Sequence, residues 1–229
     1  MPEIRRKFYE LENLQLERLA QATVDPDSKW HTDESPIARS RNRYTNVAPW
    51  TSNRVHLNVP DTACDYINAS PIELRSRKDG SAKRYIATQG PKAAQYSHFW
   101  RMIWQETGPV AVVVMLTKTL ELGRDKCFQY FPDADTEPWE VRDDVGEFGD
   151  GFHATVTLQS KKRDPRSACT VRKLIMCVGN ETKVVWHLFF KGWPDYNVPE
   201  GDDKSALLEL IKLANEKNLG NENPLIVHC

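Results

Sequence analysis

Near its C-terminal end the chain reads KVVWHLFF at residues 183–190 and PLIVHC at residues 224–229, two apolar stretches that predict β-strands. In the first, both sets of alternating side chains are largely apolar, which is typical of a strand buried on both faces of a sheet. The second predicts another central strand. Residues 202–217 between them have helical spacing. Helix and strand thus alternate here, which favours a layered α/β or α+β domain with a mixed sheet.

Three segments have the apolar spacing of helices. Residues 2–23 predict an amphipathic helix, and a polar loop over residues 25–40 follows it. A second helix begins after Ser97, which is a suitable N-cap, and ends before a Gly-Pro pair. The helix that separates the two C-terminal strands takes Asp202 or Asp203 as its cap. Its predicted apolar face consists of Leu207, Leu210, Ile211 and Ala214.

Further strands are predicted where apolar residues alternate or run together between turn residues. They comprise residues 110–116, 127–131, 153–160 and 170–178. The chain also contains an acidic block at residues 133–150 and a basic block at residues 161–173. Because blocks of charge alone are weak evidence of binding, we interpret both as solvated faces of hairpins.

Length and charge exclude several classes of protein. The 229 residues suffice for one large domain or two small ones. The formal net charge is −1, so no overall basic field attracts nucleic acid or an anionic membrane. The longest apolar run, residues 110–116, is far too short to span a bilayer, which takes about 20 residues. The first residues are basic without an apolar stretch behind them, so no secretory signal is expected.

Five cysteines are spread along the chain without a CxxC pair. Because their number is odd and their spacing wide, we expect neither a disulfide framework nor a zinc site. A reducing compartment is the better match, which favours a cytoplasmic protein and leaves the nucleus open.

The first candidate for chemistry is the pair His228 and Cys229 at the end of an apolar strand. A cysteine in this position faces a crevice in an open α/β sheet. A neighbouring imidazolium, or a ring of backbone N–H groups, would lower the pKa of the thiol and produce a nucleophilic thiolate. The alternative is a buried structural cysteine, which is the commoner state of free cysteine.

The second candidate is Asp195, which follows Trp193 and Pro194 in a loop. A carboxyl group carried into an apolar pocket has a raised pKa and can act as a general acid. The alternative is an ordinary Pro-Asp turn residue. A third candidate is Tyr44, which could pack against an aromatic ligand. The alternative is a core tyrosine whose hydroxyl is hydrogen-bonded, which is the commoner state of this residue.

These features occur together with others in one order, and the sequence thereby resembles the catalytic domain of the protein tyrosine phosphatases. The matching segments are NRY at 42–44, DYINAS at 65–70, YIATQGP at 85–91, FWRM at 99–102, KCFQYFP at 126–132, WPD at 193–195 and VHC at 227–229. The resemblance implies a highly twisted mixed β-sheet flanked by helices. It also implies a single domain over residues 1–229, incomplete at its C-terminal end, with an N-terminal helical and loop region at 1–40 and a motif-bearing core at 41–229.

The resemblance assigns the central roles by matching positions. Cys229 corresponds to the family's nucleophile, and His228 to the residue that helps to lower its pKa. Asp195 corresponds to the general acid, carried with Trp193 and Pro194 on a mobile loop. No metal or cofactor is required in this family's reaction.

Other matches concern the substrate and the walls of the pocket. Tyr44 corresponds to the residue that packs on the phosphotyrosine ring and sets the depth of the pocket. Asn46 stands where many relatives carry Asp to bind the peptide backbone, so this contact is expected to differ. Glu121 corresponds to the glutamate that orients the phosphate-loop arginine, and Lys126 to the lysine that meets the closed acid loop. The remaining supporting residues are Arg43 and Gln89.

The implied reaction has two steps. Cys229 attacks phosphorus while Asp195 protonates the leaving tyrosyl oxygen, and water then hydrolyses the phosphocysteine with Asp195 as base. Backbone N–H groups, a helix N-terminus and an arginine would hold the phosphoryl group, and they are expected after Cys229. We therefore expect the native chain to continue and the 229-residue polypeptide to be inactive.

The leading interpretation is thus a signalling enzyme that dephosphorylates phosphotyrosine in proteins. The alternative is a catalytically inactive phosphotyrosine-binding or regulatory module on the same fold. The expected partners are phosphotyrosine-containing proteins, with no nucleic acid and no membrane insertion. Retention of the acid, the nucleophile and the aromatic residue favours the enzyme. Sequence alone leaves the oligomeric state unknown.

Overall fold

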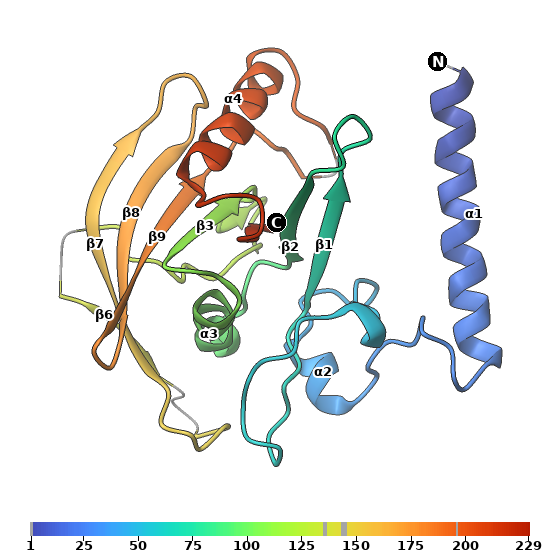
Figure 1. Ribbon diagram of the computed structural model, residues 1–229, viewed down its shortest axis with the longest axis horizontal. Helices are drawn as coiled ribbons and strands as arrows, with labels where there is room; N and C mark the ends of the chain where they lie inside the picture. The colour runs from blue at the N-terminus through green and yellow to red at the C-terminus, as the bar shows by residue number, and fades with distance from the viewer. Residues whose placement is uncertain (1, 135–136, 143–145, 196) are drawn as a thin grey trace.

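The computed structural model describes residues 2–134, 137–142, 146–195 and 197–229. Within these residues the centre of the fold is an eight-stranded mixed sheet in the order β1-β2-β10-β3-β9-β8-β7-β6 (Figure 1). Its strands are β1 Ala69–Arg75, β2 Ala82–Thr88, β3 Val110–Met115, β6 Trp139–Arg142, β7 His153–Arg163, β8 Thr170–Val178, β9 Glu181–Phe189 and β10 Leu225–His228. A separate ribbon pairs β4 Leu120–Glu121 with β5 Arg124–Asp125. The twisted mixed sheet flanked by helices is confirmed.

The helices are α1 Pro2–Val24, α2 Pro36–Arg41, α3 Tyr96–Glu106 and α4 Asp202–Lys217, with short 3₁₀ turns at Thr51–Asn53 and Ala93–Gln95. Two predicted caps are wrong. Gln95 is the N-cap of α3 because a 3₁₀ turn leads directly into the helix. Gly201, with φ 52°, is the N-cap of α4. Asp202 and Asp203 therefore lie in the first turn, where a negative charge still favours the helix N-terminus.

The last strand lies in the middle of the sheet. β10 pairs in parallel with β2 on one side and with β3 on the other, so Ile226 lies between Ile86 and Val113. β3 in turn pairs in parallel with β9. Both apolar stretches near the C-terminal end are therefore internal strands, as their composition predicts.

The two faces of the sheet are covered by different helices (Figure 1). Along β3, Val113 packs in the cluster that contains the α3 residues Phe99 and Trp100. Its neighbour Val112 packs in the second cluster, with Leu210 of α4. This alternation follows from the pleat of a strand, which points successive side chains to opposite faces.

Several local expectations fail. Residues 127–131 do not form a strand, because the N–H groups of Cys127 and Phe128 donate to the loop carbonyls of Thr119 and Pro91 instead of to a ladder. Residues 36–40, predicted as the end of the polar loop at 25–40, are helical and belong to α2, which Ser35 caps. The buried residues of α4 are Ala206, Leu210 and Ala214, whereas Ile211 is exposed. Strands β1, β2 and β6 lie in segments for which no strand was predicted.

Helix α1 exists as predicted, but its apolar residues do not pack on the sheet. Ile4, Phe8 and Leu11 are exposed to 72%, 55% and 67%. Figure 1 shows the helix standing beside the β1 edge, apart from the rest of the fold. Near its C-terminal end, the guanidinium of Arg18 lies 4.3 Å from the ring centroid of Trp30.

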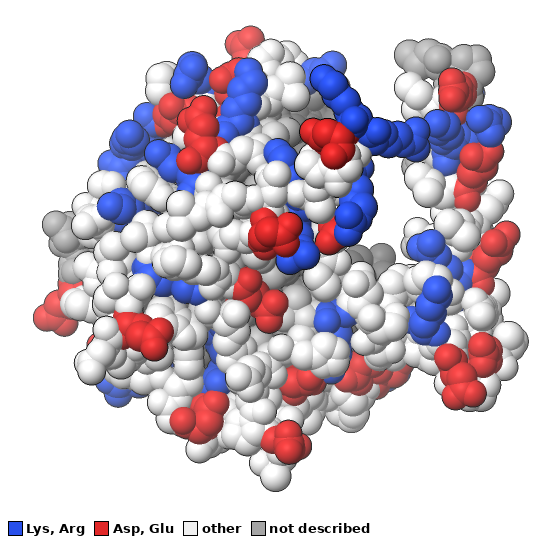
Figure 2. Space-filling model, viewed as in Figure 1, with Lys and Arg blue, Asp and Glu red and all other residues white. Residues whose placement is uncertain are grey.

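The two charged blocks meet in the folded chain. Asp133 of the acidic block pairs with Lys161 and Arg172 of the basic block, and Arg172 is buried. The interpretation as purely solvated faces is therefore wrong for Arg172, because the fold brings a carboxylate to it. Figure 2 shows both signs of charge interspersed on one face, consistent with the small net charge. Among the described residues, no helix combines the length and apolar character needed to cross a membrane.

Candidate active site

The candidate site lies where parallel strands end at one edge of the sheet. β10 ends beside Cys229, β2 leads into Gln89, β3 leads toward the β4–β5 ribbon and β9 leads into the Trp193 loop. Backbone hydrogen bonds hold these ends together. The N–H of Gly90 donates to Cys229 O at 2.9 Å, and the N–H of Leu116 donates to His228 O at 2.9 Å. The carboxyl edge of parallel strands is the usual place for a ligand site in such folds.

Cys229 is exposed at this edge, yet the protein around it partly desolvates the thiol. This desolvation, the Asp195 carboxylate and the Glu121 carboxylate raise the pKa of Cys229, against the opposing effects of Lys126 and a Thr117 hydrogen bond. The lowered thiol pKa expected from the sequence is therefore not found among the described residues. The physical reason is that burial and neighbouring negative charge both disfavour a thiolate.

His228 is buried beneath the site. Burial lowers its pKa to about 3, with a smaller contribution from Arg43, so the imidazole is neutral at pH 7. Its Nε2 lies 2.8 Å from the Tyr130 hydroxyl, which also lies 3.0 Å from Nε2 of His187. The sequence-based expectation of an imidazolium next to Cys229 is wrong here. A neutral His228 can act on the cysteine through position alone.

Asp195 and Lys126 meet at the site. Lys126 Nζ donates to Asp195 Oδ2 at 2.5 Å, and both side chains are partly buried. The loop is also braced internally, since Trp193 Nε1 donates to Asn197 O at 3.0 Å. At its start, a Cβ on Gly192 would lie 2.4 Å from Asp203 Oδ1, so α4 packs closely against this loop. The expected contact between the lysine and the acid loop is present in the structure.

Arg43 ties the Tyr44 segment to two other parts of the site wall. Its guanidinium donates to Gly90 O at 3.0 Å, to Pro91 O at 2.7 Å and to Asp125 O at 3.1 Å. Tyr44 is 40% exposed, so its ring is available to a ligand. Asn46 is exposed as well.

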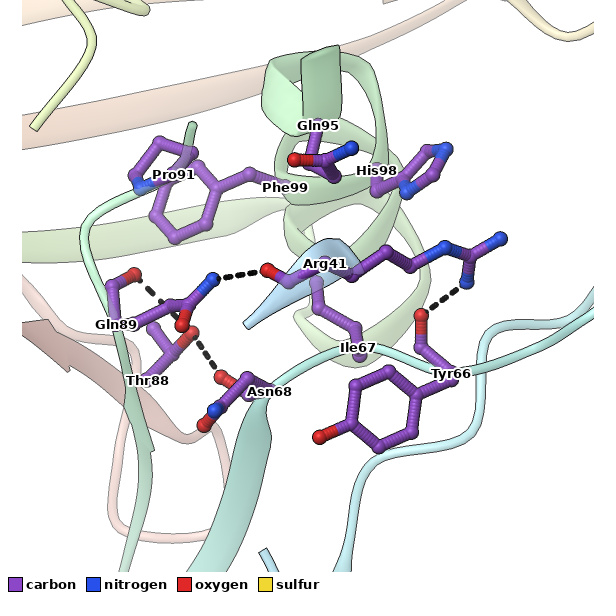
Figure 3. Close-up of a pocket in the computed structure, with 10 residues that line it drawn as sticks. All are labelled: Arg41, Tyr66, Ile67, Asn68, Thr88, Gln89, Pro91, Gln95, His98 and Phe99. Carbon is purple, nitrogen blue, oxygen red and sulfur yellow. Dashed lines mark hydrogen bonds between the residues drawn. The ribbon is translucent and has the colours of Figure 1, made fainter. Parts of the chain in front are cut away.

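Gln89 connects the strand end to the same segment. Its Oε1 accepts the N–H of Arg43 at 2.8 Å, and its Nε2 donates to Arg41 O at 2.7 Å. Gln89 and Arg41 line a cavity of about 10 Å³, and Figure 3 shows them among its lining residues. This volume accommodates about one water molecule and excludes an aromatic ring, so the cavity belongs to the support of the site.

Glu121 lies in the β4–β5 ribbon with its side chain 14% exposed, 3.4 Å from Lys118 Nζ. Tyr130 and His187, the buried pair next to His228, were not predicted as part of the site. The apolar residues around Tyr130 indicate a buried side chain. Because a buried tyrosine hydroxyl normally has a polar partner, this pattern could have predicted a hydrogen bond from Tyr130 to another buried residue.

Comparison with known proteins agrees with this geometry. The family model described as "Protein-tyrosine phosphatase" matches residues 38–229. Tyrosine-protein phosphatase 3 of Schizosaccharomyces pombe is 34% identical over 196 residues, which are 85% of this chain and 60% of that protein. The chain thus spans less than two thirds of that relative.

Solved structures agree as well. The catalytic domain of human protein tyrosine phosphatase non-receptor type 18 is 27% identical, with a TM-score of 0.73, over 100% of this chain and 75% of that chain. A structure described as PTPN18 in complex with HER2-pY1248 phosphor-peptides is 28% identical, with a TM-score of 0.73, over 96% of this chain and 74% of that chain.

Proposed function

Because this chain belongs to the protein-tyrosine phosphatase family, we propose that it hydrolyses phosphotyrosine in proteins, with Cys229 as nucleophile and Asp195 as general acid and base. The solved similar structure with bound phosphopeptides supports this substrate class. Phosphotyrosine proteins are accordingly the proposed partners, in a signalling role.

The observation that supports the proposal most strongly is the contact between Lys126 and Asp195 at the edge of the sheet where β10 ends beside Cys229. Asp195 also acts electrostatically on the Cys229 thiol, so acid and nucleophile face one site. A general acid has to lie within hydrogen-bond reach of the leaving oxygen, and this loop supplies one beside the nucleophile.

In the first step, the Cys229 thiolate forms a bond to phosphorus while the bond to the tyrosyl oxygen breaks. The proton of the Asp195 carboxyl group passes to that oxygen, and tyrosine leaves. In the second step, Asp195 takes a proton from water, whose oxygen attacks phosphorus. The S–P bond breaks, and the thiolate and inorganic phosphate are released.

The other side chains position these groups. Tyr44 packs on the substrate ring, and Asn46 lies on the same segment to contact the peptide. Glu121 and Lys126 support the phosphate side and the acid loop. Four further residues hold these segments in place: Arg43, Gln89, Trp193 and Pro194.

We also propose that residues 1–229 belong to one phosphatase domain, with an N-terminal region at 1–40 and a core at 41–229. The free state of all five cysteines supports a reducing location, the cytoplasm or the nucleus.

The test is Cys229→Ser in the full-length protein, measured on a phosphotyrosine peptide. Turnover should be abolished while peptide binding persists, because an alcohol is far less ionised than an activated thiol. Cys177→Ser is the matched control and should turn over like the parent, since Cys177 lies on β8. Near-normal hydrolysis by the Cys229 variant would remove that residue from its role.

The same measurements test the alternative of an inactive binding module. A full-length parent that binds the phosphopeptide tightly and shows no turnover would establish this alternative.

A further inference from the structure

The turn of the β4–β5 ribbon has an unusual residue at its first position. Strand pairing of Glu121 with Arg124 leaves Leu122 and Gly123 as a two-residue turn, with φ of 49° and 73°. Positive φ at both central positions is typical of a type I′ turn, which favours Asn-Gly. Glycine adopts this region freely, whereas a leucine there brings its Cβ close to the following carbonyl oxygen.

The side chain of Leu122 does not offset this backbone cost by packing within the protein. Leu122 is 89% exposed, so its side chain gains no burial inside the protein. The other non-glycine residue with positive φ in the described part of the chain is Ala168, which is partly buried and has a smaller side chain. A strained backbone that persists without local compensation is a reason to look for a function of the side chain.

The ribbon is fastened to both walls of the candidate site. On one side, Lys126 follows β5 and donates to Asp195 of the acid loop at 2.5 Å. On the other side, Asp125 O accepts a hydrogen bond at 3.1 Å from Arg43, the residue before Tyr44. Glu121, adjacent to Leu122, lies close enough to Cys229 to raise its pKa. The open end of the ribbon therefore lies between the acid loop and the Tyr44 segment, and Glu121 connects it to the turn at Leu122.

We propose that Leu122 is a specificity-determining residue whose side chain contacts an apolar residue next to the phosphotyrosine of the substrate. This inference rests on the proposed function. Contact with an apolar substrate residue would remove the leucine from water and so provide the stabilisation that the free protein lacks. Polar side chains at that substrate position would gain nothing from Leu122.

The test uses the full-length protein and two phosphotyrosine peptides that differ only in having Leu or Ser on both sides of the phosphotyrosine. The readout is the ratio of their kcat/KM values, which cancels any general effect on catalysis. The variants are Leu122→Asn, which suits positive φ, and Leu122→Met, which stays apolar. Leu74→Asn is the matched control, since Leu74 is 57% exposed on the β1 edge strand without positive φ.

We expect the parent to prefer the Leu peptide by roughly 3–10-fold. Leu122→Asn should bring the ratio close to one and raise Tm by about 2–4 °C, because Asn tolerates the left-handed region. Leu122→Met and Leu74→Asn should both keep the parent ratio. A parent ratio near one, a full preference in Leu122→Asn, or no rise in its Tm would overturn the inference.

Turnover of p-nitrophenyl phosphate by the parent separates this inference from the function on which it rests. If the parent hydrolyses the small aryl phosphate and shows no peptide preference, the inference fails and the proposed function stands. If the parent hydrolyses neither substrate, the proposed function fails and the inference with it.

Discussion

Asp195 combines two properties in one side chain. It lies 2.5 Å from the ammonium of Lys126, and its carboxylate raises the pKa of the Cys229 thiol. Lys126 lowers the same pKa, so the charge on the thiol depends on how the two residues are placed. A movement of the Trp193 loop that changes the position of Asp195 would therefore also change the environment of Cys229, the proposed nucleophile.

Replacement of Asp195 by Ala tests its role as the acid. In the full-length protein, Asp195→Ala should lower turnover of a phosphotyrosine peptide by roughly 10²–10⁴-fold, the usual range for general acid catalysis. Turnover of an aryl phosphate with a good leaving group should fall much less, because that oxygen needs no proton. Asp61→Ala, which removes an exposed carboxylate, should leave both rates unchanged. Equal losses on the two substrates would show that Asp195 is structural.

Among the elements, β9 and β10 are joined to the 126–132 segment through one tyrosine. The Tyr130 hydroxyl lies between Nε2 of His187 and Nε2 of His228. The Nδ1 atoms of both histidines are buried without a hydrogen-bond partner among the described residues. Protonation would place a charge in the core with no hydrogen-bond partner at Nδ1 to stabilise it, so burial keeps both imidazoles neutral.

This arrangement predicts how stability depends on pH. Burial lowers the pKa of His187 well below its usual value and that of His228 to about 3. An unfolded histidine takes up a proton near pH 6.5, whereas these folded ones do not. The unfolded state therefore binds more protons below that pH. The free energy of unfolding should fall by about 2 kcal/mol for each histidine between pH 7 and pH 5.

Urea unfolding of the full-length protein at pH 7, 6 and 5 measures how the free energy of unfolding changes with pH, in a range where few carboxylates titrate. In His187→Asn, the fall in this free energy between pH 7 and pH 5 should be about half as large as in the parent. His153→Asn, which removes an exposed histidine, should show the same fall in the free energy of unfolding as the parent. A parent whose stability is constant from pH 7 to pH 5 would contradict the neutral, buried network.

In the molecule as a whole, the last strand joins two halves of the chain. β10 lies between β2 and β3, so the N-terminal hairpin β1–β2 reaches the rest of the sheet through it. Its central residue, Ile226, has no exposed surface. The same strand leads to Cys229 at the site, so the stability of the sheet and the position of the proposed nucleophile depend on the same few residues.

Ile226→Ala should therefore destabilise the full-length protein by about 2–5 kcal/mol, the range for a large buried aliphatic side chain. Ile72→Ala is the matched control on the edge strand β1, where the side chain is 39% exposed. Its cost should stay below about 1 kcal/mol, because less surface returns to water. Urea unfolding compares the two variants, and equal costs would argue against a central position of β10.

The sequence by itself determined the parts of this protein that local pattern encodes. Alternation over residues 183–190 and helical spacing over residues 202–217 specify their elements, because each pattern depends on neighbours within a few residues. The identities of Cys229 and Asp195 as candidates followed from motifs in a fixed order. The strand predicted over residues 127–131 is wrong, because an apolar run alone does not reveal which groups its backbone will hydrogen-bond.

Tertiary structure alone decided what depends on residues far apart in the chain. Burial beside Tyr130 makes His228 neutral, and the placement of Asp195 and Glu121 near Cys229 raises the pKa of that thiol. Likewise, the positive φ of Leu122 follows from the pairing of β4 with β5. Desolvation, distance between charges and turn geometry are set by three-dimensional neighbours, which no local pattern of residues specifies.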